Sequence, residues 1–238
     1  MKLGIMQPYF IPYIGYWQLM NAVDKYVIYD DVNFIKGGWI NRNRILLNGE
    51  PKYFNIPMIG ASSFKLINAI EVNNDERLIL KNLRIIEAAY KKAPHYAEGY
   101  RLMEDILRCG EQNLATYIAE SFKILCNYMD IKTELIKSSD LKKNCDLKGT
   151  EKVVEICKLL GAKEYYNAIG GQQLYSLSEF KKNGLELKFL KTEPFCYKQF
   201  KGDFQNNLSI IDVIMFNSKN DIKQMLKKYT LIEGEMYK

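Results

Sequence analysis

A short polar stretch carries the clearest signs of chemistry in this chain. Trp39-Ile40-Asn41-Arg42-Asn43-Arg44 follows closely on Tyr29-Asp30-Asp31-Val32-Asn33, so aromatic rings, two guanidiniums, carboxamides and two carboxylates gather within one segment. A protein core needs none of these polar groups, and burying them unpaired is costly. Arginine matches planar anions, and carboxamides both donate and accept hydrogen bonds. A solvated loop is the simpler interpretation, but the interleaved apolar residues favour a lined pocket for an anionic ligand.

A second candidate is the segment Gln7-Pro8-Tyr9-Phe10-Ile11-Pro12-Tyr13-Ile14-Gly15-Tyr16. Its prolines stiffen the chain, and Gly15 allows a ligand to approach the backbone where a helix begins, a place that favours phosphate or carboxylate. A rigid turn with its aromatics in the core explains the same residues equally well. The spacing of Pro12, Tyr13, Gly15 and Tyr16 faintly resembles the nucleotidyltransferase signature Pro-x-His-x-Gly-His. Both histidines are absent, and their loss argues against that reaction.

Several common chemistries are excluded by composition. His95 is the only histidine, and no Gly-x-Ser-x-Gly elbow, Walker loop or Gly-x-Gly-x-x-Gly accompanies it. The five cysteines are widely spaced without a Cys-x-x-Cys pair, so we expect no metal site, no disulfide framework and a cytoplasmic location. Ser209 and Asp212 have the spacing of a near capping box, which explains both; a place for Asp212 in the site is the less favoured use.

The bulk properties bound the class of protein. The chain has 238 residues, 47% of them hydrophobic and 26% charged, with a net charge of +6. This balance suits a globular protein that binds an anionic small molecule, and the basic residues form no tract typical of nucleic-acid binding. No apolar run is long enough for a signal peptide or a membrane span, so we expect no membrane insertion.

Short apolar runs alternate with helical patterns along the chain, which is typical of an α/β fold. We predict a Rossmann-like, mostly parallel sheet with flanking helices, a β-hairpin near 44–56 around Asn48-Gly49, and a helical segment near 75–129. We expect one domain over 1–238, with 75–129 as a helical subdomain, and a polar, mobile tail after residue 228. The other predicted strands are 3–6, 26–29, 66–72, 133–136, 164–166 and 185–190, and the other helices are 16–23, 150–160, 176–182, 209–216 and 219–228.

Four predicted strands end in polar or glycine-rich sequence. These ends are Gln7-Pro8-Tyr9, Asp30-Asp31, Ser138-Ser139-Asp140 and Asn167 to Gln172, which contains Gly170 and Gly171. Ligands of open parallel sheets bind beyond the carboxyl ends of the strands. We therefore expect these side chains to surround one cavity, although many strand-to-helix loops are polar without binding anything.

Taken in order, these segments resemble the WbqC-like family over nearly the whole chain. The motifs are Gln7-Pro8-x-x-x-Pro12 with Gly15-Tyr16, Asp30-Asp31-Val32, Trp39-x-Asn41-Arg42-Asn43, Tyr90-Lys91-Lys92-Ala93-Pro94, Ser138-Ser139, Tyr166…Gly170-Gly171…Tyr175, and Tyr197-x-Gln199…Leu208-Ser209-x-x-Asp212.

The resemblance implies a place in O-antigen or other surface-polysaccharide biosynthesis, with glycyl or acyl transfer to an amino sugar as the proposed reaction. The chain departs from the family pattern twice. Met6 stands where relatives often have a histidine before Gln-Pro, and Lys81-Asn82-Leu83 stands where they often have one in the helix before Tyr90. If either histidine is the general base in relatives, a carboxylate must replace it here or the activity differs.

Our leading hypothesis is therefore an N-acyl or aminoacyl transferase, of the glycyl type, that acts on a nucleotide-linked amino sugar. Asp30 or Asp31 would take the amine proton, and Arg42 and Arg44 would hold diphosphate or carboxylate. No cofactor is expected to bind tightly; the donor would be an acyl thioester on coenzyme A or on an acyl or aminoacyl carrier protein. The remaining expected binding residues are Gln7, Tyr9, Gly15, Tyr16, Asn33, Lys36, Trp39, Asn41, Asn43, Ser139, Gly170, Gly171, Tyr175 and Gln199.

Two alternatives stay open at this point. One is a nucleotide-dependent transferase related to nucleotidyltransferases, which would consume ATP and release pyrophosphate. The other is a non-catalytic protein that binds a sugar nucleotide or a partner enzyme.

Overall fold

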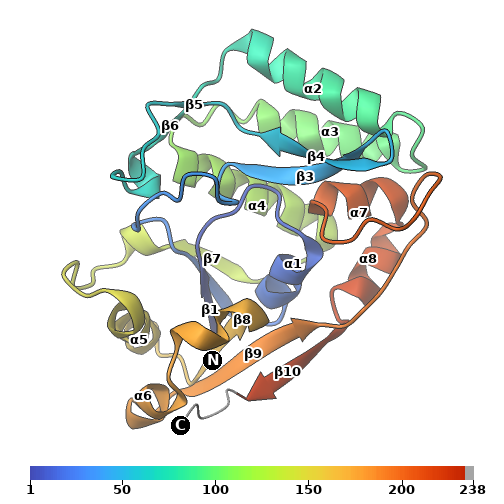
Figure 1. The fold of residues 1–238 in the computed structure, drawn as a ribbon. Helices are drawn as coiled ribbons and strands as arrows, with labels where there is room; N and C mark the ends of the chain where they lie inside the picture. Colours follow the sequence, from blue (N-terminus) through green and yellow to red (C-terminus); the bar gives the residue numbers. More distant parts are fainter. Residues whose placement is uncertain (234–238) are drawn as a thin grey trace.

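A computed structural model describes residues 1–233 of the chain. Its centre is a six-stranded sheet in the order β10-β9-β8-β1-β2-β7, parallel except for β10, which runs antiparallel to β9 (Figure 1). The predicted mostly parallel sheet is confirmed. The strands are β1 (Lys2–Met6), β2 (Lys25–Ile28), β7 (Glu134–Lys137), β8 (Glu164–Ala168), β9 (Glu186–Thr192) and β10 (Tyr229–Glu233).

Helices cover both faces of the sheet, as the alternation of side chains in its strands requires. In β2, Val27 points into one apolar cluster, while Tyr26 and Ile28 point into the other. The first cluster includes helices α5 (Gly149–Leu159) and α6 (Leu177–Lys182). The larger second cluster includes α1 (Ile14–Asn21), α4 (Leu114–Met129), α7 (Ile210–Phe216) and α8 (Lys219–Met225). No described helix is both long and apolar enough to cross a membrane.

The predicted hairpin forms between β3 (Arg42–Leu47) and β4 (Glu50–Asn55). Asn48 and Gly49 at its turn have φ of 55° and 80°, the left-handed pair that a two-residue hairpin turn requires. Figure 1 shows this hairpin between the body of the sheet and a layer of helices, α2 (Glu76–Tyr90) and α3 (Tyr96–Leu107). Asp75 caps α2 and Asn113 caps α4, so the predicted helical segment is also confirmed.

Two local predictions are wrong. The segment 66–72 is not one strand, because it forms a short 3-10 helix, η1 (Ile67–Ala69), followed by β6 (Glu71–Val72), which pairs with β5 (Met58–Ile59). Part of the supposed polar tail is β10, whose five residues pair with β9 and cover an edge that would otherwise be open. The rest of that tail, from residue 234, lies outside the described residues.

Candidate functional site

Asp30 lies directly beyond β2 and is fully buried. Its Oδ1 accepts a hydrogen bond from the main-chain amide of Ser139 at 2.9 Å, and its Oδ2 accepts one from the Ser139 hydroxyl at 2.6 Å. Since Ser139 follows β7, this pair fastens the ends of two neighbouring strands. Both carboxylate oxygens of Asp30 therefore accept hydrogen bonds within the protein. The role of Asp30 as a general base stays a prediction that these contacts do not support.

Asp31 forms a second buried cluster at the same edge, here called the Asp31 cluster, with Lys143 and Lys152. The two ammonium groups lie 2.8 and 3.0 Å from Oδ2, and both lysine side chains are almost completely buried, at 2% and 7% exposed. Burial raises the pKa of the Asp31 carboxyl, but Lys143, Ser138 and Lys152 lower it by more, so the pKa lies below its ordinary value. A carboxylate held charged in this way is a weak general base at neutral pH. The role of Asp31 as the catalytic base stays a prediction.

Four of the predicted binding residues line one cavity of about 320 Å³, the aromatic pocket. Its lining residues are Tyr9, Tyr13, Trp39, Asn43, Arg44 and Asn207. Tyr9 and Tyr13 come from the loop after β1, so the pocket lies beyond the carboxyl end of a central strand, where ligands of such sheets bind. Burial raises the pKa of both phenols, which keeps them protonated and able to donate hydrogen bonds.

The two predicted arginines differ in how many of their N–H donors are bonded to the protein. Arg42 donates from Nε to the Gly38 carbonyl at 2.9 Å and from Nη2 to the Gly37 carbonyl, and its guanidinium stacks 4.4 Å from the Tyr53 ring centre. Arg44 donates from Nη2 to the Asn207 carbonyl at 3.3 Å, but its buried Nε has no partner among the described residues. Arg42 is thus occupied by its own loop, whereas Arg44 keeps a donor for a ligand.

Asn43 has a structural task at the base of the aromatic pocket. It is 4% exposed, and its Nδ2 donates to the carbonyls of Phe10 and Ile11, both at 3.1 Å. Its Oδ1 accepts from the Arg44 amide at 2.9 Å. Asn43 therefore ties β3 to the loop after β1 and holds Arg44 in position, which leaves it little capacity to bind a ligand hydroxyl.

Three further predicted residues lie in a separate cavity of about 500 Å³, the hairpin pocket. Its lining includes Lys36, Asn41 and Arg42. Asn33 lies outside this lining and donates to the Ser63 carbonyl at 3.1 Å. The polar stretch from Trp39 to Arg44 is therefore divided between two cavities rather than gathered around one.

Other predicted residues are used in packing. Tyr16 is 2% exposed, and its hydroxyl donates to the Gln7 carbonyl at 2.8 Å. A Cβ at Gly15 would lie 2.5 Å from the Tyr13 ring and 2.7 Å from Thr192 Oγ1, so packing alone explains this glycine. A ligand role for these residues stays a prediction that the contacts do not support.

The glycine-rich end of β8 is also occupied by the chain itself. Gly170 and Gly171 form part of a 3-10 helix, η3 (Ile169–Leu174), and a Cβ at Gly171 would lie 3.1 Å from the Asn167 side chain. Tyr175 packs against Tyr165, with the hydroxyls 3.3 Å apart. Gly170, Gly171 and Tyr175 line neither the aromatic pocket, nor the hairpin pocket, nor the larger cleft described next. None of these three cavities is surrounded by all four of the predicted strand ends.

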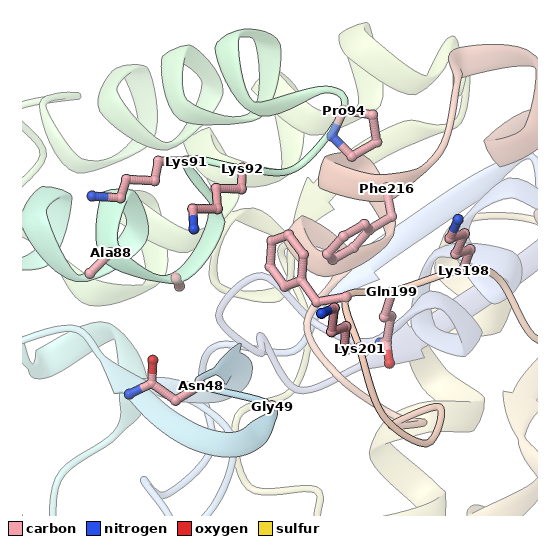
Figure 2. A pocket seen from close by; sticks show the side chains of 12 residues that line it. Asn48, Gly49, Ala88, Lys91, Lys92, Pro94, Lys198, Gln199, Lys201 and Phe216 are labelled. Atoms are coloured by element: carbon pink, nitrogen blue, oxygen red, sulfur yellow. The ribbon is translucent and has the colours of Figure 1, made fainter.

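The third cavity is a basic cleft of about 1160 Å³ between the end of α2, the tip of the hairpin and the loop that joins β9 to α7 (Figure 2). Lys91 and Lys92 stand on one side of the cleft, Lys198 and Lys201 on the other, and Asn48 lies at the hairpin tip. The remaining lining residues are Gly49, Ala88, Ala89, Pro94, Gln199, Phe200 and Phe216. Gln199 is the one residue of this lining that was predicted as a binding residue.

A buried carboxylate lies beside this cleft. Asp212 is fully buried; its Oδ2 accepts from the Tyr90 hydroxyl at 2.9 Å, and its Oδ1 accepts from the Tyr197 hydroxyl at 2.6 Å and from Gln199 Nε2 at 2.8 Å. Burial raises the pKa of Asp212, and the three hydrogen bonds lower it by less, so the pKa stays above its ordinary value.

The predicted capping role of Asp212 is wrong. Ser209 caps α7 by accepting from the Ile211 amide, but the Asp212 side chain turns to Tyr90, Tyr197 and Gln199 instead. Sequence reasoning left Tyr90, Tyr197 and Asp212 out of the site. The signal that could have found them is their occurrence in two of the motifs, the one that begins at Tyr90 and the one from Tyr197 to Asp212, which the fold brings together in one hydrogen-bonded group.

Comparison with known proteins shows the family of this chain. The model of the WbqC-like protein family matches residues 7–224. The chain belongs to the WbqC-like protein family. An uncharacterized protein of Mycobacterium tuberculosis is 28% identical over 218 residues, which cover 91% of this chain and 93% of that relative. The match to the family model includes every residue of the aromatic pocket and of the basic cleft.

The described part of the chain contains no cluster of side chains arranged to hold a metal ion. No group of three or more histidine, cysteine, aspartate or glutamate side chains is placed to hold a metal ion among residues 1–233. The ionisable side chains that line the three cavities are lysines, arginines and tyrosines, which favour anion binding and hydrogen-bond donation.

Proposed function

We propose that the protein transfers an acyl or aminoacyl group from a thioester to the amine of a nucleotide-linked amino sugar, in the biosynthesis of a surface polysaccharide. The observation that carries the proposal is the unpartnered, buried Nε of Arg44 beside a pocket lined by Tyr9, Tyr13 and Trp39. A guanidinium next to aromatic rings suits a ligand that joins an anionic group to a ring. Membership of the WbqC-like family supports the same class of substrate.

In this proposal the aromatic pocket holds the acceptor. Trp39 is 38% exposed and offers a ring face to the sugar or the base, and the Arg44 guanidinium, which lines the same pocket, binds a phosphate oxygen. The Arg44 guanidinium lies 5.7 Å from the centre of the Trp39 ring, so the two groups can contact adjacent parts of one ligand. Asn43 holds this arrangement from below through its bonds to the loop after β1.

The reaction needs an amine without its proton and donors for the negative charge that develops on the carbonyl oxygen. The amine nitrogen attacks the thioester carbonyl carbon, the C–S bond of the tetrahedral intermediate breaks, and the thiolate leaves with the proton lost by the nitrogen. Tyr9 and Tyr13, whose raised pKa keeps them neutral, are suited to donate hydrogen bonds to the oxyanion. Asp30 and Asp31 remain the predicted bases. Because neither lines the aromatic pocket, the proton would pass from the amine to them through intervening groups.

The proposal is tested by mixing the protein with acyl thioesters and nucleotide-linked amino sugars and following N-acylated product by mass spectrometry. Arg44→Gln should raise the KM for the sugar nucleotide at least tenfold, with a smaller change in kcat, because the arginine holds the same phosphate in ground and transition states. Arg101→Gln, an exposed arginine on α3, is the control and should behave like the unchanged protein.

Two outcomes would overturn the proposal. An unchanged KM in Arg44→Gln would remove the aromatic pocket as the acceptor site. Pyrophosphate release from ATP without N-acylation would select the nucleotide-dependent transferase, and sugar-nucleotide binding without any product would select the non-catalytic alternative.

A further inference from the structure

The basic cleft gathers four positive charges without opposing carboxylates. Lys91, Lys92, Lys198 and Lys201 all line it, and none of them makes an ion pair with any residue in the described range 1–233. Like charges around one cavity repel each other, and a bound anion would remove that repulsion. The aromatic pocket proposed for the acceptor contains a single positive charge, so the two cavities differ in the ligand they suit.

Stabilisation of a helix end explains only half of this charge. Lys91 is the C-cap of α2 and Lys92 follows it, and lysines there interact favourably with the helix dipole. Lys198 and Lys201 come from the loop between β9 and α7, far away in the sequence, and have no such task. Figure 2 shows them across the cleft from the end of α2. The convergence of two unrelated segments therefore points to a ligand that bridges them.

The loop that carries Lys198 and Lys201 is held against the helices by buried hydrogen bonds. Tyr197 and Gln199, on either side of Lys198, both donate to Asp212. Gln199 also accepts from the Gln205 amide at 2.8 Å and donates to the Gln205 carbonyl at 3.0 Å, which closes the loop on itself. The lysines of this loop are thus positioned by its buried neighbours, as a prepared anion site requires.

The size and lining of the cleft favour a large ligand with an aromatic part. Its volume of about 1160 Å³ exceeds the range of roughly 300–1,000 Å³ usual for small-molecule pockets, so inorganic phosphate alone would leave it largely empty. Phe200 and Phe216 meet edge to face, with ring centres 4.8 Å apart, and both line the cleft. Phe200 is only partly buried and can offer a ring face to a base.

We infer that the basic cleft binds the 3′-phosphorylated adenosine diphosphate part of a coenzyme A thioester. Three phosphate groups would face the four lysines, and the adenine would lie against Phe200. The inference rests on the proposed function, because the donor is taken to be a thioester. It selects coenzyme A over a carrier protein, since the lysines surround a hollow rather than a flat or convex surface on which a folded acidic domain could dock.

The hairpin connects the two cavities. Arg44 in β3 lines the aromatic pocket, and Asn48, in the turn that follows β3, lines the basic cleft; the four residue steps between them span roughly 13 Å at about 3.3 Å per residue. The pantetheine arm of coenzyme A is an extended chain of that order of length. Donor phosphates in the cleft and an acceptor amine in the aromatic pocket could therefore meet at the thioester.

Calorimetric titration with coenzyme A tests the inference on the complete chain. Lys198→Ala/Lys201→Ala should weaken coenzyme A binding at least tenfold and flatten its dependence on salt, because two phosphate contacts are lost. Lys91→Ala/Lys92→Ala should do the same. The matched control is Lys181→Ala/Lys182→Ala, which removes two exposed lysines at the end of α6 and should leave the affinity unchanged.

The affinities of coenzyme A fragments identify which chemical groups the cleft binds. Dephospho-coenzyme A and ADP should each bind more weakly than coenzyme A, since each lacks the 3′-phosphate, and inorganic phosphate should bind weakest. Equal affinity for coenzyme A in all three double variants would overturn the inference. Competition between coenzyme A and the sugar nucleotide for one site would also overturn it, because the acceptor would then occupy the cleft.

The outcomes separate this inference from the proposed function. If coenzyme A fails to bind but acyl transfer occurs from a carrier protein, the inference is wrong and the proposed function stands. If coenzyme A binding depends on the cleft lysines but no amino sugar is acylated, the cleft stands as a coenzyme A site and the proposed function is wrong.

Discussion

Asp31 and Asp212 are both largely buried carboxylates, yet their surroundings shift their pKa values in opposite directions. Asp31 faces two lysines, which lower its pKa. Asp212 faces only neutral donors, the Tyr90 and Tyr197 hydroxyls and the Gln199 amide, and burial raises its pKa. At Asp212 the neutral hydrogen bonds lower the pKa by less than burial raises it, whereas at Asp31 the two ammonium groups together with Ser138 lower the pKa by more than burial raises it.

The difference also separates two kinds of site. In the Asp31 cluster both lysines pair with one carboxylate, and they also donate to the Ser138 and Asp31 carbonyls, so the two ammonium groups are engaged within the protein. Beside Asp212 the positive charges of the cleft stay unpaired, and the buried group holds the loop that presents them. Lysines that are paired within the protein favour a structural role, whereas lysines without an ion pair among the described residues favour the binding of an anion.

Among these variants, the greatest loss of stability is expected from removing the negative charge of Asp31. Asp31→Asn leaves Lys143 and Lys152 buried without a counter-charge and should cost about 3–5 kcal/mol of unfolding free energy. Asp146→Asn, at an exposed aspartate in the same region, should stay within about 0.5 kcal/mol. Urea unfolding measures both. A loss below about 1 kcal/mol for Asp31→Asn would show that the lysines find other partners, and activity of the folded variant would then test Asp31 as base.

A smaller effect is expected in the Asp212 network. The Tyr90 hydroxyl donates to Asp212 and accepts from the buried Leu46 amide at 2.9 Å, so Tyr90→Phe leaves both groups without this partner. We expect a loss of about 1–3 kcal/mol. Tyr53→Phe, at an exposed tyrosine of the hairpin, is the control and should change little. Equal stability of the two variants in urea would mean that water replaces the Tyr90 hydroxyl.

The smallest effect, and the sharpest test of the comparison, is the dependence of stability on pH. The folded-state pKa of Asp31 lies below 3.8, so its stabilising contribution is present above 3.8 and is lost as pH falls through the folded value. The folded-state pKa of Asp212 lies above 3.8, so its contribution is present below 3.8 and is lost as pH rises through the folded value.

Unfolding free energies of Asp31→Asn and Asp212→Asn, each measured against the unchanged protein from acid to neutral pH, should therefore diverge. The deficit of Asp31→Asn should shrink on acidification, and that of Asp212→Asn should shrink as pH rises above 3.8. Parallel curves for the two variants would contradict the opposite pKa shifts.

Regular elements followed closely from the sequence because they depend on local patterns. The Asn48-Gly49 turn specifies its hairpin through backbone conformations that these two residues adopt easily. The helix from residue 76 follows from its cap at Asp75 and its apolar spacing. β10 escaped prediction because five residues are too few for a clear pattern, and its pairing depends on the edge of β9.

The site was predicted less completely, for a geometric reason. Tyr9, Trp39 and Arg44 do share a cavity, because the loop after β1 and the start of β3 meet at the end of the sheet. Arg42 and Arg44 looked equivalent in the sequence, but they line different cavities, and of the two only Arg44 has a buried donor without a partner among the described residues. Side-chain partners of this kind cannot be read from spacing.

Local periodicity, turn residues and ordered motifs are properties of the linear chain, so the α/β class, the hairpin, the helical segment and the family could be predicted from the sequence. That Tyr90, Tyr197, Gln199 and Asp212 form one buried group, and that lysines from two distant segments line one cleft, became visible with the folded chain. Those relations depend on the long-range packing of α2 and α7 with the loop that joins β9 to α7, and this packing sets which charges are paired and which remain available to a ligand.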